Sequence, residues 1–189
     1  MADLTTLGVT FHYGVETAKG TKPTAFTWLK RCSSIGGISL DTEQIDVSAL
    51  EDFITQYASG RQDTGGTWDV TFNLNADVIT ALKKLMTDAA TGKPKGFRVW
   101  FEVVFPDLAD AFFVIADPGK NIPLSDIGQN EAATIPLSLI IQEYKGLDTK
   151  VVSEELTQAL DTAKAVADSI CCKSIRLYLG RLLYPLGLP

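Results

Sequence analysis

Apolar and polar residues alternate along much of the chain, and this pattern predicts a mainly β protein. In residues 67–74 every second residue is apolar and those between are polar, which is typical of a strand with one buried face. These apolar positions are Trp68, Val70, Phe72 and Leu74. Related patterns predict strands over residues 7–13, 25–35, 97–105, 111–117 and 133–141. Because proline cannot donate to a ladder, Pro136 indicates a sheet edge or a bulge in the last of them.

A helix is predicted directly after the strand at residues 67–74. Asn75 is a good N-cap, Asp77 in the first turn suits the helix dipole, and Gly92 and Pro94 end the pattern. Apolar residues recur between them at helical spacing, at Val78, Leu82, Leu85 and Ala89. A second helical stripe follows near the C-terminus, at Leu156, Ala159, Ala163, Val166 and Ile170.

Two segments are predicted to lack regular structure. Residues 14–24 contain Gly, Pro and Lys and predict a flexible arm. Residues 41–65 predict a loop of unusual length, since connections in compact domains usually run ~2–6 residues. This second segment carries more apolar side chains than a permanently solvated loop would, at Ile45, Val47, Leu50, Phe53, Ile54 and Tyr57. We therefore expect it to be disordered in the free chain and to pack on a partner.

The order of elements predicts the fold class. Two strands, a long loop, a strand, a helix and three strands indicate an antiparallel β-sandwich or open barrel with one packed α-helix. A helical C-terminal appendage is predicted to follow it. We accordingly expect a β domain over residues 1–145, a linker over 146–151 and the appendage over 152–189, whose role the pattern does not indicate.

Composition and charge narrow the range of partners. The formal net charge of −6 argues against a surface built to bind nucleic acid. The first residues have no basic start and no apolar run, so no signal peptide is expected. The apolar run after residue 174 is too short and too interrupted by Arg, Gly and Pro to span a bilayer. An amphipathic segment that lies on a membrane surface remains an alternative for these residues. The cysteines Cys32, Cys171 and Cys172 have no framework spacing, which favours reduced thiols in the cytosol.

The residue pattern offers no catalytic or metal-binding constellation. His12 is the single histidine and is expected to be a strand residue with an ordinary hydrogen bond. The glycine-containing stretches at 32–37 and 59–66 match neither a Walker loop nor a dinucleotide-binding turn, and are interpreted as turns. The carboxylates near residues 41–52 lack EF-hand spacing and are interpreted as solvated loop charge. We expect neither an enzyme nor a bound cofactor or metal.

One resemblance stands out. A Trp-containing strand, a segment reading IDVSALED, an aromatic loop with GRQDTGG, and the strand TWDVTFNLN follow one another here. This succession resembles the major tail tube proteins of long-tailed bacteriophages, over about residues 1–145. The matching residues are Trp28, Ile45, Asp46, Val47, Ser48, Leu50, Tyr57, Gly60, Asp63, Gly65, Trp68 and Asn75.

The resemblance implies a structural protein of the virion. Such subunits stack as six-membered rings into a hollow tail tube through which DNA passes, with the long loop ordering on neighbouring subunits. It implies homo-oligomerisation, partners such as the tape measure and tail terminator proteins, transient non-specific passage of DNA, and no membrane. It places the chain in the virion tail, and in the host cytoplasm during assembly. The subunit-contact residues would be Ile45, Asp46, Val47, Leu50, Phe53, Ile54 and Tyr57.

Two alternatives and one finer assignment remain open. The chain could be another tube-fold component, such as a tail terminator or a type VI secretion tube-like protein, or a monomeric intracellular β-sandwich binding module. Within the tube interpretation, the polar face of the strand at 67–74 suits the lumen, with Asp69, Thr71 and Asn73 as candidates. Trp100 is expected on a covered or subunit-contacting surface because its size would narrow a channel.

Overall fold

The computed structural model of the protein describes residues 6–106 and 108–151. Residues up to Val151 form one compact unit, which is the unit considered below. The predicted helical appendage at 152–189 lies outside the described residues.

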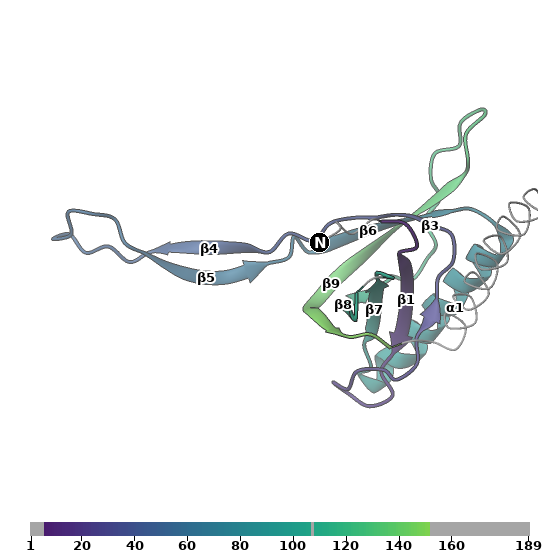
Figure 1. Cartoon of the computed structure of the whole chain (residues 1–189), viewed down its shortest axis with the longest axis horizontal. Helices are drawn as coiled ribbons and strands as arrows, with labels where there is room; N and C mark the ends of the chain where they lie inside the picture. Colours follow the sequence, from purple (N-terminus) through teal and green to yellow (C-terminus); the bar gives the residue numbers. More distant parts are fainter. Residues whose placement is uncertain (1–5, 107, 152–189) are drawn as a thin grey trace, which may run out of the picture. The chain divides into compact units, whose positions relative to one another are not determined.

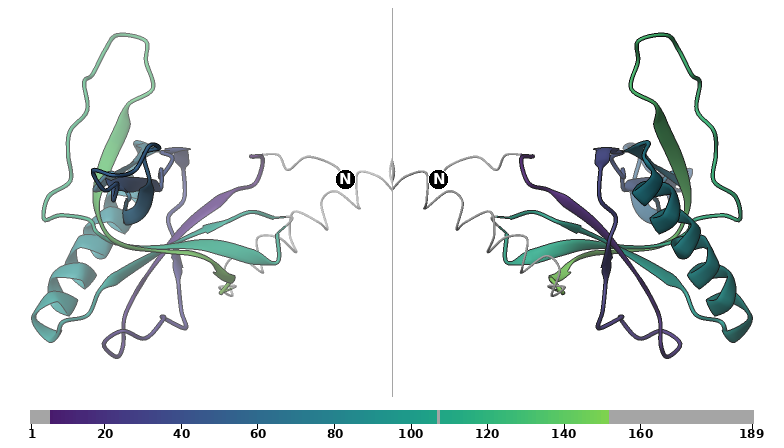
Figure 2. Two further views of the ribbon diagram at one scale, coloured as in Figure 1. Left: turned by 90° about the vertical axis from the view of Figure 1, so that its left-hand side faces the viewer. Right: turned by 90° about the vertical axis from the view of Figure 1, so that its right-hand side faces the viewer.

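The described chain is built on a single antiparallel sheet that curls into a half-barrel (Figure 1, Figure 2). Its spatial order is β2-β1-β7-β8-β9-β6-β3. The bounds are β1 (Thr10–Val15), β2 (Thr27–Trp28), β3 (Cys32–Ile35), β6 (Thr67–Asn73), β7 (Val99–Val104), β8 (Asp110–Asp117) and β9 (Thr134–Thr149). The predicted mainly β fold with one packed helix is confirmed, and it takes the open-barrel form.

The helix α1 (Ala76–Gly92) begins where its cap was predicted. The Val78 amide donates to Oδ1 of Asn75 at 2.7 Å, which satisfies one of the free donors of the first turn. A short 3₁₀ turn, η1 (Lys93–Lys95), follows the helix. The apolar stripe of α1 packs on one face of the sheet, here called the inner face, through Val78, Leu82, Leu85, Met86 and Ala89.

The core on the inner face is centred on Phe11 of β1. Its ring lies edge-on to Trp68 at 5.4 Å between centroids and stacks on Phe101 at 5.5 Å. Alternation along β6 and β7 brings these rings to the same face, because successive side chains of a strand point to opposite sides. Trp68, Val70 and Phe72 are buried as predicted, whereas Leu74, beyond the end of β6, is partly exposed.

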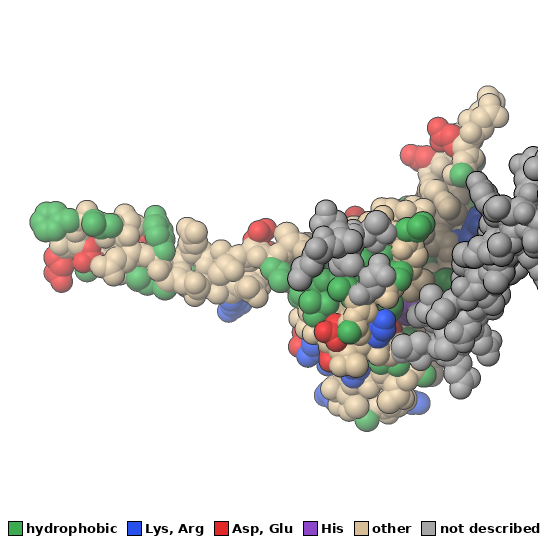
Figure 3. Space-filling view, viewed as in Figure 1, with side chains coloured by type: hydrophobic (Ala, Val, Ile, Leu, Met, Phe, Trp, Pro, Cys, Tyr) green, Lys and Arg blue, Asp and Glu red, His purple; other side chains and the backbone are tan. Residues whose placement is uncertain are grey.

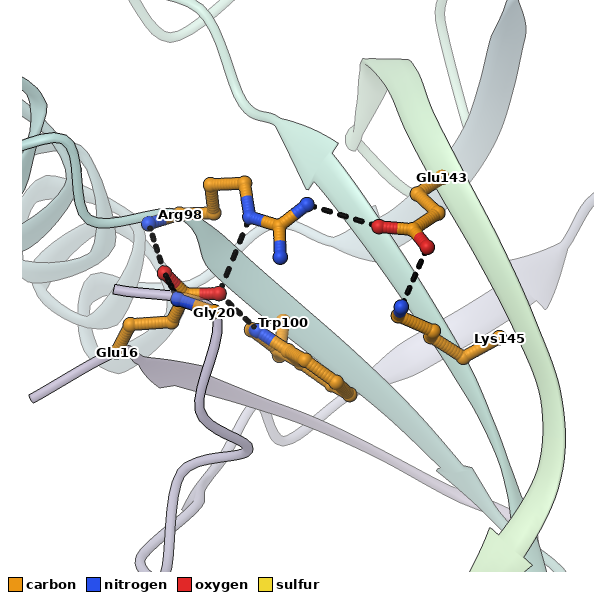
Figure 4. Close-up of polar contacts among 6 residues, drawn as sticks. All are labelled: Glu16, Gly20, Arg98, Trp100, Glu143 and Lys145. Carbon is orange, nitrogen blue, oxygen red and sulfur yellow. Dashed lines mark hydrogen bonds and ion pairs between the residues drawn. The ribbon is translucent and has the colours of Figure 1, made fainter. Parts of the chain in front are cut away.

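The prediction of a flexible arm at residues 14–24 is wrong. This segment folds back over the other, outer face of the sheet and is held there by a buried carboxylate (Figure 4). Glu16 accepts hydrogen bonds from Nε1 of Trp100 at 2.9 Å and from the Gly20 amide at 3.1 Å. It also accepts from the backbone amide of Arg98 at 3.2 Å and from the Arg98 Nε at 3.1 Å.

The electrostatics of this cluster favour the ionised Glu16. Burial raises the pKa of Glu16, but hydrogen bonds from Trp100, Gly20 and Arg98 outweigh it, so the pKa is lowered overall. Arg98 also pairs with Glu143 of β9 at 2.8 Å, and Glu143 pairs in turn with Lys145 (Figure 4). Trp100 is therefore on a covered surface, as expected, and it packs edge-on against Phe113.

Two predicted boundaries change. The strand predicted at 25–35 is interrupted at Arg31, whose φ of 65° lies in the left-handed region, and becomes β2 and β3 at opposite edges of the sheet. The prediction of a linker at 146–151 is wrong for its first four residues, because β9 continues to Thr149 and pairs with β8. Pro136 does sit at a local edge: β9 pairs with β8 only from Ile140 onward, so at Pro136 it has β6 on one side alone.

His12 and Glu102 face each other across β1 and β7 on the outer face, and both are fully buried. His12 hydrogen-bonds the Thr10 hydroxyl at 2.9 Å, as an ordinary strand histidine would. Oε1 of Glu102 accepts from the Val151 amide at 2.8 Å, while its Oε2 has no hydrogen-bond partner among the described residues. Burial raises the pKa of Glu102 from 4.5 to about 7, and the hydrogen bond from the Val151 amide and the charge of Lys22 partly oppose this rise.

This raised pKa predicts a pH-dependent stability. Between pH 4.5 and about 7 the folded chain binds more protons at Glu102 than the unfolded chain, so its stability falls as pH rises through this window. We expect Glu102→Gln to reduce this fall in the free energy of unfolding by up to ~3 kcal/mol, since one pKa unit corresponds to ~1.4 kcal/mol. Denaturant unfolding of both proteins at pH 5 and pH 8 measures the effect. Equal pH dependence in the two proteins would contradict it.

Candidate assembly surface

Residues 41–63 form a β-hairpin that projects away from the sheet (Figure 1). Its strands are β4 (Asp41–Asp46) and β5 (Tyr57–Asp63), and they pair only with each other. The prediction of a loop at 41–65 is therefore wrong for these two strands. Neither strand alternates between apolar and polar residues, because both faces of the hairpin are exposed. This hairpin is called the arm below.

The base of the arm is irregular. Asp41 lies opposite Asp63, and like charges in direct cross-strand pairs destabilise a ladder. The register shifts between Thr42 and Gln44, and the partner strand places Gly60 there. A Cβ at Gly60 would meet the Glu43 carbonyl oxygen at 3.0 Å, so the tight crossing of the strands favours glycine. The base thus contributes little stability of its own.

The tip of the arm, residues 47–56, is closed by local hydrogen bonds. The Val47 amide donates to the Gln56 carbonyl at 3.0 Å, and the Gln56 amide donates to Oγ of Ser48 at 2.8 Å. The Ala49 amide donates to Oδ2 of Asp52 at 2.7 Å. These bonds close the tip, and its large apolar side chains are exposed.

Large apolar side chains on the arm are exposed in the part of the chain that the structure describes (Figure 3). Leu50 and Phe53 are 109% and 105% exposed, and Ile54 is 79% exposed. All the predicted contact residues are exposed there: Ile45, Asp46, Val47, Leu50, Phe53, Ile54 and Tyr57. A group of exposed apolar side chains at the end of a projection is typical of a surface that packs on a partner.

Asp46 differs in role from its apolar neighbours. Its Oδ1 accepts from the Ser48 amide at 2.9 Å, so it fixes the turn from β4 into the tip. Hydrogen bonds from the side chain and backbone of Ser48 hold the pKa of Asp46 below its ordinary value. The structure therefore gives Asp46 a local positioning role within the arm.

An isolated two-stranded hairpin is marginally stable in water, and this predicts a strong dependence on assembly. We expect the β4 and β5 amides to exchange with solvent quickly in dilute subunit and slowly in assembled protein, because only a partner excludes water from them. Hydrogen exchange of both states, with the α1 amides as internal reference, measures this. Strong protection of the arm in dilute monomer would contradict the prediction.

The lumen candidates lie together on the outer face of β6. Asp69 is exposed and accepts a hydrogen bond from the Ser138 hydroxyl of β9, whereas Thr71 and Asn73 are half-buried. The backbone at both half-buried positions is tied to the neighbouring segment: the Thr71 carbonyl accepts from Ser33, and the Asn73 amide donates to Arg31. The outer face of β6 is thus polar with one carboxylate, and Pro136 and the exposed Ile140 of β9 lie beside it on the same face.

Sequence reasoning missed a second projection, the loop between β8 and β9 at residues 118–133 (Figure 1). It carries Leu124 and Ile127, which are both well exposed. The signal in the sequence was the presence of Ile122, Leu124 and Ile127 in a stretch rich in turn-forming residues, similar to the apolar residues that marked the arm.

A groove opens on the inner face, at the part of the sheet that α1 does not cover. Its volume is about 590 Å³. The floor is formed by Trp68, Val103 and Val114, and half-buried apolar residues of the β3 segment, including Ile35 and Ile38, form one wall. We refer to this cavity as the inner groove.

Residues 6–106 and 108–151 contain no cluster of three or more His, Cys, Asp or Glu that could hold a metal ion. Within the same residues, no helix is both long and apolar enough to cross a membrane.

Comparison with known proteins gives little. No protein-family model matches the chain, and no curated protein matches it. Among solved structures, it is similar to a chain in the cryo-EM structure of the anti-feeding prophage (AFP) baseplate, 6-fold symmetrised. That match has 11% sequence identity, covers 79% of this chain and 97% of the other, and has a TM-score of 0.46.

Proposed function

We propose that this chain is a structural subunit that assembles with copies of itself, through the arm, into the stacked rings of a phage tail tube. The observation that carries the proposal is the arm: it exposes large apolar side chains at the end of a hairpin whose two strands pair with no other strand of the described chain. Leaving such side chains in water is unfavourable, by ~25 cal/mol for each Å² of apolar surface. Burial against a partner would recover this energy.

The role is structural rather than catalytic under this proposal. His12 is buried in a strand and Glu102 is buried beside it, so neither is offered to a substrate. Three parts of the proposal come from the resemblance of residues 1–145 to tail tube proteins: the tube, the six-membered ring and the location in the virion tail. Assembly would take place in the host cytoplasm, with tape measure and terminator proteins as further partners, and DNA would pass without lasting contact.

A polar, acidic wall suits a channel for DNA because phosphate contacts would slow transit. We therefore propose that the outer face of β6, with Asp69, Thr71 and Asn73, lines the lumen. In virions carrying Asp69→Lys and Asn73→Lys we expect normal tubes and roughly 10-fold slower DNA ejection at low salt, because a ring multiplies each added charge. The matched pair Asp77→Lys and Thr80→Lys makes the same charge change on exposed positions of α1 and should eject normally. Normal ejection by the β6 variant would remove these residues from the lumen.

A second candidate function draws on the inner groove. At about 590 Å³ it falls within the ~300–1,000 Å³ typical of small-molecule sites, so a monomeric binding module could use it. That function leaves the apolar tip of the arm unexplained, which is why we favour assembly. Another tube-fold component, such as a tail terminator or a type VI secretion tube-like protein, would share the arm. Of these, the terminator would stop at a single ring.

Sedimentation velocity over a concentration series tests the proposal. We expect the purified protein to form species much larger than a monomer, with the large fraction increasing with concentration. A monomer that persists at high concentration would contradict assembly and support the binding module. A single discrete ring that does not grow would favour the terminator alternative.

A further inference from the structure

The inner groove and the tip of the arm have matching chemistry on a single chain. The groove is lined by half-buried apolar side chains of β3 and its continuation, while the tip carries apolar side chains that are exposed among residues 6–106 and 108–151. Neither surface is closed by the other within the chain. The inference below rests on the proposed self-assembly and identifies the surface that receives the arm.

The wall of the groove is held rigidly. The Gly36 amide donates to the Asp69 carbonyl at 2.7 Å, and Nε1 of Trp68 donates to the Gly36 carbonyl at 2.7 Å. A Cβ at Gly36 would meet the Asp69 carbonyl oxygen at 2.8 Å, so this close approach requires glycine. The groove is thus preformed, and binding of a partner carries no entropic cost of ordering its wall.

The arm cannot fill the groove of its own chain. The arm begins only three residues after Ile38, which lines the groove, and it projects away from the sheet (Figure 1). The six residues of β4 span ~20 Å at ~3.3 Å per residue, and the tip lies beyond them. The tip of one chain is therefore out of reach of its own groove but well placed to enter another.

Size and charge fit the same occupant. A groove of about 590 Å³ has room for a few large side chains, as Leu50, Phe53 and Ile54 supply. The tip also carries Glu51 and Asp52 and no Lys or Arg. Arg31 is exposed and directly precedes the groove residue Cys32, so a cation stands beside the groove.

We propose that the inner groove accepts the arm tip of a second copy of this chain, with Leu50, Phe53 and Ile54 as anchors. Donor and acceptor are different surfaces of the chain, so the contact is heterologous. Such contacts join subunits head to tail and produce closed rings or open helical filaments. The groove and the arm together therefore form a repeating connection, as a ring or a tube needs.

Disulfide cross-linking tests this arrangement. In a background of Cys32→Ser, Cys171→Ser and Cys172→Ser, one protein carries Phe53→Cys in the tip and another carries Ser34→Cys in the groove wall. Under mild oxidation we expect their equimolar mixture to give a covalent dimer, and each protein alone to give far less. Ile38→Cys provides a second groove position, and Lys84→Cys, exposed on α1, provides the control that should not cross-link to the tip.

The outcomes separate this inference from the proposed function. Tubes without a tip-to-groove cross-link at either groove position would overturn the inference and leave the tube standing. The same result would follow if residues 1–5 or a small apolar ligand occupied the groove. A cross-linked dimer without tubes would support the inference and contradict the tube. Cross-linking of the tip to Lys84→Cys as readily as to the groove would also overturn the inference.

Discussion

Leu50→Asp is expected to abolish assembly while leaving the subunit folded. Leu50 is fully exposed and contacts no core residue, and surface substitutions of this kind usually change stability by no more than ~0.5 kcal/mol. In the assembled protein the new carboxylate would be buried without a partner, which costs several kcal/mol, roughly 3 or more. Because the contact repeats around a ring, the loss repeats with it. Sedimentation velocity should show monomer only, and the thermal midpoint should stay within ~2 °C of the wild-type value.

Tyr57→Asp, also on the arm and exposed, should behave in the same way. Ser59→Asp is the matched control, since it adds the same charge to an exposed position on β5 without removing an apolar side chain. We expect Ser59→Asp to assemble. If Leu50→Asp and Tyr57→Asp unfold as monomers, the arm belongs to the core of the subunit. If they assemble normally, the arm is not the contact surface.

Glu16→Ala is expected to destabilise the subunit by ~3–5 kcal/mol, the usual cost of removing one partner from a buried ion pair. The variant would leave Nε1 of Trp100 and the Arg98 amide buried without their acceptor, and it would release the segment that covers the outer face. Denaturant unfolding measures the loss. Because Glu16 titrates with a lowered pKa, part of its contribution should also disappear as the pH is lowered below the ordinary carboxyl range.

Glu143→Ala is the control for this cluster. Glu143 pairs with the same arginine, but its side chain is 41% exposed, and surface pairs are worth ~0–1 kcal/mol. We expect a loss of less than ~1 kcal/mol. Equal losses for the two variants would show that the cluster acts as a surface network and that Glu16 does not hold the segment over the sheet.

The strands and the helix of the core could be predicted because burial against the inner face sets the spacing of their apolar residues. The alternation of Trp68, Val70 and Phe72 and the helical spacing of Leu82 and Leu85 both follow from burial on the inner face. The Asn75 cap is local chemistry, so it is equally visible in sequence. The curled single sheet could not be told from a sandwich, since both have the same alternating strands.

The errors have a different origin. The two arm strands face water on both sides, so no alternation marks them, and only the apolar side chains of the arm as a whole gave a signal. The segment around Glu16 was predicted as flexible because its stabilising contacts come from Arg98 and Trp100, more than 80 residues away in the chain. The inner groove was missed for the same reason: it combines residues of β3, β7 and β8 that only the fold brings together.

Electron microscopy of the purified wild-type protein tests the central claim most directly. The account predicts hollow tubes of stacked rings, with an axial hole in end-on views and with density for each arm reaching a neighbouring subunit. Particles that remain single subunits at every concentration, with no rings and no tubes, would contradict it.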